Sequence, residues 1–199
     1  MAQLVSKTAT PSDSFEVAAA LVTAWSKLRS EPLTNDIVRL LLTLSDLETA
    51  TWKSCWNWNL GNIIKTTQWT GDWYNALDSG NARQFRAYPS LTAGAEGLVA
   101  LVTSDTRRQW REGLLSGDPG RFVQALKGLF GGPQYFEANL DSYLSGFLAR
   151  YKRYANVDFL GKETPISAGP TLEPEKPTWY LMGIAALGAA YAVWAKSGK

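Results

Sequence analysis

Residues 35–48 read NDIVRLLLTLSDLE and decide the fold of this chain. The segment follows a cap at Thr34 or Asn35 and has the pattern of a helix. At about 100° per residue, one apolar stripe of this helix ends on a carboxylate instead of another leucine. The members of the stripe are Ile37, Leu41, Leu44 and Glu48. We therefore expect Glu48 to be partly buried, and Asp46 to lie on the opposite, solvent-facing side.

The segment after this helix is rich in aromatic and amide side chains. Residues 52–62 read WKSCWNWNLGN, and five of the nine tryptophans fall within residues 52–73. A partly buried carboxyl group beside such a turn indicates an acid that is kept protonated and donates to a polar substrate.

The composition excludes several classes of protein. Of the 199 residues 45% are apolar and 19% are charged, which is typical of one substantial folded domain plus an appendage. The net charge of +2 argues against a nucleic-acid partner. Without histidine the chain has no Ser-His-Asp triad, no Cys-His dyad and no histidine-bound zinc, and Cys55 is its single cysteine. We expect neither a metal nor a cofactor.

The rest of the pattern predicts a mainly α-helical domain with one small antiparallel β lobe. The β lobe is expected between residues 57 and 89, where turn residues alternate with aromatic and β-branched pairs, with its reverse turn at 78–81. Helices are expected on both sides of the lobe, the last of them long and amphipathic from about Tyr135 to Tyr154. We expect the first ten residues to be frayed.

The end of the chain differs in composition from the rest. Residues 1–160 form the predicted domain, and residues 161–178 form a linker with four prolines. Residues 179–195 are uncharged and would make a helix of roughly 26 Å, close to the thickness of a bilayer. Tryptophan and tyrosine at its ends match interfacial aromatic belts. We predict a transmembrane anchor within residues 179–199; a buried or oligomer-forming helix is the alternative.

Charge and the N-terminal sequence predict where the domain acts. Lys196 and Lys199 favour a cytoplasmic C-terminus, with the domain on the opposite side of the membrane. The first thirty residues contain no continuous apolar core of a signal peptide. This combination is typical of a protein carried in a virus particle or released through a pore. We expect a membrane-anchored virion protein that acts at the bacterial envelope, with other virion proteins as possible partners.

Three short segments carry a family resemblance. They read LETATW at 47–52, NWNLGNI at 57–63 and FRAYPSL at 85–91. In order and spacing they resemble the glucosaminidase family of peptidoglycan hydrolases, which are lysozyme-like proteins of bacteria and phages. The resemblance covers about residues 35–105 and implies an α+β lysozyme-like fold and a glycosidase that cleaves between N-acetylglucosamine and N-acetylmuramic acid.

The resemblance also implies roles for individual residues. Glu48 corresponds to the general acid, and burial beside Leu44 and tryptophan side chains would raise its pKa. Tyr88 corresponds to a tyrosine close to the acid. The turn that lines the cleft would contain Asn59, Gly61 and Asn62.

The second catalytic group is left open by the sequence. Asp72 is the preferred candidate for a base that activates water, and Asp78 is the other. If neither takes part, the N-acetyl or C6 hydroxyl group of the substrate can act instead. The product would then be the anhydro sugar of a lytic transglycosylase.

Aromatic and amide side chains are the candidates for binding the glycan strand. The aromatic ones would stack on sugar rings, and the amides would bond acetamido and hydroxyl groups. We expect at most two of the clustered tryptophans to contact substrate, because aromatic side chains are more often part of a core. The binding candidates beyond the turn are Trp52, Asn57, Trp58 and Trp69. Two rival interpretations are a non-catalytic glycan-binding or structural protein and a pore component.

Overall fold

Helix α2 (Asn35–Glu48) begins where the sequence predicts, because the Thr34 side chain accepts a hydrogen bond from the amide of Ile37. Helix α1 (Ser14–Leu28) begins with a complete capping box between Asp13 and Glu16. Both signals are local in sequence, and α2 has the bounds that the sequence predicts.

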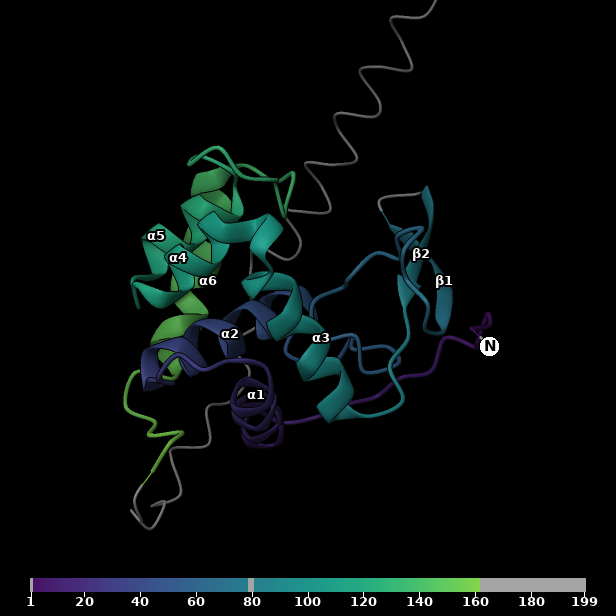
Figure 1. The fold of residues 1–199 in the computed structure, drawn as a ribbon, viewed down its shortest axis with the longest axis horizontal. Helices are drawn as coiled ribbons and strands as arrows, with labels where there is room; N and C mark the ends of the chain where they lie inside the picture. Colours follow the sequence, from purple (N-terminus) through teal and green to yellow (C-terminus); the bar gives the residue numbers. More distant parts are fainter. Residues whose placement is uncertain (1, 79–80, 162–199) are drawn as a thin grey trace, which may run out of the picture. The chain divides into compact units, whose positions relative to one another are not determined.

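The computed structural model describes residues 2–78 and 81–161, which belong to one compact unit (Figure 1). Its remaining elements are β1 (Trp73–Asp78), β2 (Asn81–Arg86), α3 (Leu91–Thr103), the 3-10 helix η1 (Asp105–Arg107), α4 (Arg108–Leu115), α5 (Pro119–Leu126) and α6 (Leu140–Arg153). The two strands lie on one side of the unit and helices α4 and α5 lie on the other, with α2 and α3 between them (Figure 1). The prediction of a mainly helical unit with one small antiparallel lobe is confirmed.

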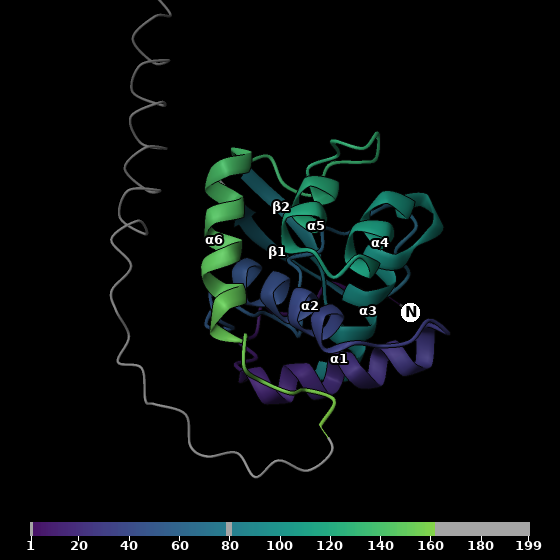
Figure 2. The same ribbon diagram turned by 90° about the vertical axis from the view of Figure 1, so that its left-hand side faces the viewer.

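Helix α2 is the centre of the core. It packs against α1, α4 and α6, with α6 beside it in Figure 2. Its leucines at positions 40, 41, 42 and 44 are all fully buried. A helix buried all round has no solvent-facing side. The expectation that Asp46 faces solvent is therefore wrong: this residue is 0% exposed.

Polar groups on the neighbouring elements satisfy the buried Asp46 carboxylate. Its Oδ2 accepts a hydrogen bond from the Tyr154 hydroxyl at 2.7 Å, and its Oδ1 accepts from Arg150 Nε at 3.2 Å. The Thr51 hydroxyl donates to Oδ1 at 2.9 Å. The network joins α2 to α6 and to the turn that follows Glu48.

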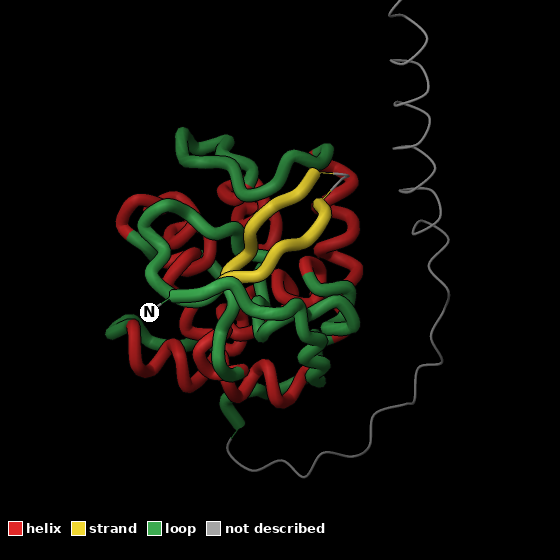
Figure 3. Tube along the Cα trace, turned by 90° about the vertical axis from the view of Figure 1, so that its right-hand side faces the viewer, coloured by secondary structure: helices red, strands yellow, loops and turns green. Residues whose placement is uncertain are grey.

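The β lobe is a hairpin with added edges. Strands β1 and β2 are antiparallel, with Trp73 opposite Arg86 and Asp78 opposite Asn81 (Figure 3). The predicted reverse turn includes residues 79–80, which lie outside the described residues. Leu4 pairs with the outer edge of β1, and Ile64 pairs with the outer edge of β2. The hairpin has its own small core of Tyr74, Phe85 and Ala87.

The N-terminal segment is ordered by this lobe, so the expectation of a frayed start is wrong. The amide of Val5 donates to the carbonyl of Trp73 at 2.8 Å, and the amide of Thr10 donates to the carbonyl of Cys55 at 3.0 Å. Polar composition alone did not reveal these partners, because they lie about 45 to 70 positions away in sequence.

The last helix begins later than the sequence predicts. Asn139 caps α6, because its Oδ1 accepts from the amides of Asp141 and Ser142. Tyr135 and Phe136 therefore lie in the loop before the helix. Among the described residues, no helix combines the length and the apolar character that crossing a bilayer requires. The predicted linker and the predicted anchor at 179–195 lie outside the described residues, apart from Gly161.

Candidate active site

Glu48 is the last residue of α2 and is half-buried. Its Oε1 accepts a hydrogen bond of 2.7 Å from the hydroxyl of Tyr143, which lies in the first turn of α6. The Tyr143 ring stacks on Phe136, with ring centroids 3.6 Å apart and planes 2° from parallel. The donor is thus held in position by packing as well as by the hydrogen bond.

Two tyrosine hydroxyls near Glu48 stay protonated. Burial, and then the negative charge of Glu48, raise the pKa of Tyr143 well above its usual value. The pKa of Tyr135 is raised by the same two causes in the same order. The Tyr135 hydroxyl donates to the carbonyl of Gly61 at 2.7 Å. Both groups are therefore neutral hydrogen-bond donors over the ordinary pH range.

Sequence reasoning missed Tyr143 as a site residue. It stands in the apolar stripe of the last helix together with Leu140, Leu144 and Phe147, so its pattern is that of a core residue. A tyrosine in such a stripe needs a partner for its hydroxyl. That requirement was the available signal, but it does not identify a partner 95 positions away.

A left-handed turn follows Glu48 directly. Ala50, Thr51 and Trp52 have φ of 50°, 60° and 56°, a conformation that costs a non-glycine residue roughly 1–2 kcal/mol. The Trp52 amide donates to Thr49 Oγ1 at 3.1 Å, and the Thr51 amide donates to the carbonyl of Asp46 at 2.8 Å. These bonds stabilise the reversal of the chain direction after α2, so that the helix ends at Glu48.

Trp52 belongs to the core and not to a binding surface. It is 3% exposed, and its indole Nε1 donates to Ser45 Oγ at 2.9 Å. The prediction that Trp52 stacks on a sugar is therefore corrected, because the ring has no accessible face.

Asn59 is likewise structural. It is 0% exposed, its Nδ2 donates to the carbonyls of Ile63 and Arg86 at 3.0 Å each, and its Oδ1 accepts from the Ile63 amide at 2.8 Å. The side chain closes the turn and joins it to β2. This corrects the prediction that Asn59 contacts substrate.

Of the other two members of the predicted turn, one contacts Glu48 and one packs against α3. Asn62 is half-buried, and its Nδ2 donates to the carbonyl oxygen of Glu48. Gly61 packs against α3: a Cβ there would come within 2.9 Å of a Leu98 methyl group and 3.2 Å of the Tyr135 hydroxyl. The turn is therefore fitted closely between α3 and the acid.

Asn57 and Trp58 are engaged with the N-terminal segment. The Asn57 Nδ2 donates to the carbonyl of Ser6 at 3.0 Å, and its Oδ1 accepts from the Thr8 amide at 2.9 Å. The Trp58 amide donates to the Thr10 hydroxyl at 2.9 Å. Both residues are half-buried, and the amide of Asn57 is used within the protein.

The remaining predicted residues line a separate groove of about 560 Å³ between the base of the hairpin and α3. Its walls include Trp69, Asp72, Arg86 and Tyr88, and Glu48 is not among the described residues that line it. The Asp72 Oδ1 accepts from the Gln3 amide at 3.0 Å. The structure thus does not bring Asp72 and Glu48 into one pocket.

Tyr88 lies at the bottom of this groove. It is 7% exposed, and burial raises the pKa of its hydroxyl, which the charge of Arg86 partly offsets. A Cβ on Gly97 would come within 2.4 Å of the Tyr88 hydroxyl, so this position in α3 has room only for glycine. The charges of Glu48 and of Tyr88 both raise the pKa of Tyr135. Tyr135 therefore lies within electrostatic reach of both groups.

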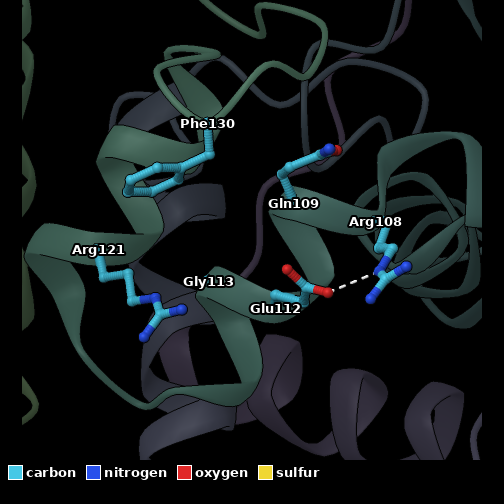
Figure 4. A pocket seen from close by; sticks show the side chains of 6 residues that line it. All are labelled: Arg108, Gln109, Glu112, Gly113, Arg121 and Phe130. Atoms are coloured by element: carbon cyan, nitrogen blue, oxygen red, sulfur yellow. Dashed lines mark hydrogen bonds and ion pairs between the residues drawn. The ribbon is translucent and has the colours of Figure 1, made fainter.

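A second hollow lies between α4, α5 and the loop after α5 (Figure 4). An ion pair of 2.7 Å between Arg108 and Glu112 crosses its rim. It contains none of the predicted site residues. In the described part of the chain, no group of three or more cysteine, aspartate or glutamate side chains could hold a metal ion.

The helical unit, the small β lobe and a glutamate at the end of the central helix define a lysozyme-like α+β fold. Solved structures with this fold are similar to the chain. One is the C-terminally truncated glycoside hydrolase domain of Salmonella typhimurium FlgJ, with a TM-score of 0.50 and 17% identity over 73% of this chain and 100% of that one. Another is the peptidoglycan hydrolase of Sphingomonas sp. A1, with a TM-score of 0.52 and 20% identity over 76% of this chain and 99% of that one.

A mutant of the Sphingomonas enzyme gives 22% identity and a TM-score of 0.50, over 71% of this chain and 97% of that one. No protein-family model and no curated protein sequence matches the chain. At identities this low, the structural similarity shows the fold alone. It is the glucosaminidase-type fold that the resemblance implied.

Proposed function

We propose that this protein is a glycosidase that cleaves the glycan strands of peptidoglycan, with Glu48 as the general acid. The observation that carries the proposal is the hydrogen bond from Tyr143 to Glu48 Oε1, at the end of the central helix. The fold shared with peptidoglycan hydrolases supports it. No histidine is present to supply the proton instead.

The geometry suits proton donation to a leaving oxygen. Glycoside cleavage needs a proton on that oxygen and stabilisation of an oxocarbenium-like centre. The Tyr143 hydroxyl donates to Oε1 and so fixes the orientation of the carboxyl group. Because the Tyr143 pKa is raised, this arrangement persists before and after the proton is transferred. Tyr143 thus orients the acid through the catalytic cycle.

Digestion of purified cell walls tests the proposal. Glu48→Gln keeps the size of the side chain and removes the acid, so we expect the rate to fall by roughly 10² to 10⁴. Glu112→Gln is the matched control, because that carboxylate lies on α4 and is paired with Arg108 at the surface. Equal digestion by the wild type and Glu48→Gln would sink the enzyme proposal and favour the glycan-binding alternative.

We propose further that the bond cleaved joins N-acetylglucosamine to N-acetylmuramic acid. Asp72 lines a groove whose described lining does not include Glu48, which favours a role for a substrate group over Asp72 as the base. Mass spectrometry of the muropeptide products identifies the new end. An anhydro-muramyl end means transglycosylation, and a reducing end that carries one added water means hydrolysis.

The proposed place of action rests on the sequence. Residues 179–195 would anchor the protein in a membrane, and local wall opening by a virion-associated enzyme is the role we propose. Deletion of residues 162–199 should leave wall digestion intact and abolish partition into vesicles. Unchanged partition after the deletion would contradict the anchor.

A further inference from the structure

The groove at the base of the hairpin is lined by a positively charged side chain, that of Arg86, which has no role in the proposed acid chemistry. Side chains alternate along an extended segment, so Phe85 and Ala87 point into the small core of the hairpin. Arg86 and Tyr88 alternate with these two residues and line the groove, to which Ala87 also contributes. The alternation thus places one guanidinium and one hydroxyl on the same wall.

Both groups carry a buried donor without a partner. Arg86 Nε and the Tyr88 hydroxyl are closed to solvent and have no hydrogen-bond partner of good geometry within the described part of the chain, although Arg86 lies close enough to Tyr88 to lower the pKa of its hydroxyl. A buried polar atom left unsatisfied costs about 1–3 kcal/mol. Both side chains line the groove and can donate hydrogen bonds, so a ligand group that only accepts them suits this wall. A carboxylate is such a group.

The carboxylates already in the groove have partners of their own. Glu96 forms an ion pair with Lys27 at 2.8 Å, and Asp72 accepts from the Gln3 amide at 3.0 Å. No ion pair with a described carboxylate satisfies Arg86. Arg107 adds a second positive charge within electrostatic reach of Arg86, since burial and then the charge of Arg86 lower the pKa of Arg107.

An aromatic ring lies beside these donors. The Arg86 guanidinium carbon is 4.6 Å from the centroid of the Trp69 ring, and the Tyr88 ring meets Trp69 edge-on at 5.4 Å. The small residues Ala93 and Gly97 of α3 complete the lining. A flat apolar ring next to a cation suits a sugar that bears a carboxylate.

We propose that Arg86 and Tyr88 bind the carboxylate of a muramyl residue in the glycan strand, with Trp69 against its sugar ring. The inference rests on the proposed function and names the part of the strand that this groove recognises. Two sources share this chemistry: the lactyl carboxylate of a strand stripped of peptide, and a carboxylate of an attached stem peptide.

Binding to fragments that cannot be cleaved tests the inference. In the Glu48→Gln background, tryptophan fluorescence measures the Kd of peptide-free tetrasaccharides with a lactyl carboxylate, and of the same fragments with that group converted to a methylamide. We expect roughly tenfold tighter binding of the acid. Adding Arg86→Gln should abolish the difference. Adding Arg121→Gln, which removes the same charge from an exposed position on α5, should preserve it.

A second pair of fragments distinguishes the sources. Peptide-bearing tetrasaccharides with free or amidated peptide carboxylates should show the preference only if the stem peptide supplies the group. No preference for the acid in either pair would overturn the inference, as would an equal loss with Arg121→Gln. If Arg86→Gln does not fold, as judged by circular dichroism, Arg86→Lys and Tyr88→Phe replace it, and both should weaken the preference several-fold.

Failure of this inference is distinguishable from failure of the proposed function. Wall digestion that depends on Glu48, combined with equal binding of acid and amide, removes the carboxylate site alone. A preference for the acid without any wall digestion keeps the site and removes the glycosidase.

Discussion

At the scale of single residues, the hydrogen bond between Tyr143 and Glu48 is the contact on which the proposed chemistry depends. Tyr143→Phe keeps the stacking on Phe136 and removes only the donor. We expect wall digestion to fall by roughly 10- to 100-fold while unfolding free energy changes by about 1 kcal/mol. Steady-state kinetics and denaturant titration measure the two effects separately.

The control for this prediction is Tyr151→Phe, since Tyr151 lies on the same helix and bonds Arg39 and Asp36 at the surface. It should leave digestion unchanged. A Tyr143→Phe protein with normal activity would mean that the hydroxyl does not orient the acid.

Residue-level reasoning from sequence found Glu48, because a carboxylate in a leucine stripe stands out in any pattern. It assigned Asn59 and Trp52 to the binding surface, because the residue type does not show whether an amide or an indole bonds the protein itself or a sugar. Trp52 belongs to the left-handed turn at 50–52, and Asn59 stands between left-handed residues at 58 and 62. Nothing in three ordinary residues signals positive φ.

At the scale of elements, Asp46 holds three of them together. Its carboxylate bonds Arg150 and Tyr154 of α6, and Thr51 in the turn after Glu48. Because α6 also carries Tyr143, a shift of this helix moves the donor to the acid. The buried network thus holds α6 against α2 and so keeps Tyr143 in position beside Glu48.

Asp46→Asn should therefore be far more disruptive than its size suggests. It keeps the shape but removes the negative charge that accepts from Arg150 and Tyr154, and breaking a buried pair costs roughly 3–5 kcal/mol. Glu112→Gln, which breaks an exposed pair with Arg108, should cost at most about 1 kcal/mol. Urea denaturation of both variants measures the difference. Similar losses would show that the Asp46 network is not a structural centre.

The sequence predicted the elements better than their environments. Caps at Asp13, Thr34 and Asp118 are local signals, and the three helices begin there. The solvent side assigned to Asp46 was wrong because periodicity assumes one exposed face, whereas α2 is covered on every side between residues 40 and 46. The N-terminal segment was misjudged for a related reason: its partners are distant in sequence.

At the scale of the whole molecule, buried tyrosines couple folding to alkaline pH. Burial is the first cause of a raised pKa for Tyr74, Tyr135, Tyr143 and Tyr154. In the unfolded chain these groups ionise near pH 10, as tyrosine ordinarily does. The folded protein therefore retains protons that the unfolded chain releases.

The sign of the effect follows from this difference. Below about pH 10 both states are protonated, and the stability from these tyrosines is fully present. As pH rises from about 10 toward the raised folded values, each buried tyrosine removes up to about 1.4 kcal/mol of unfolding free energy per pH unit. The Cys55 thiol, whose pKa burial also raises, acts in the same direction from a slightly lower pH.

We therefore expect unfolding free energy to fall steeply above pH 10, and the tyrosinate absorbance near 295 nm to rise together with unfolding. Denaturant titrations from pH 8 to pH 11, with circular dichroism as the probe of folding, measure both. Tyr154→Phe should make the decline shallower, since it removes one of the coupled groups. Gradual ionisation of all eight tyrosines in a folded protein near pH 10 would contradict the burial on which the neutral donors beside Glu48 depend.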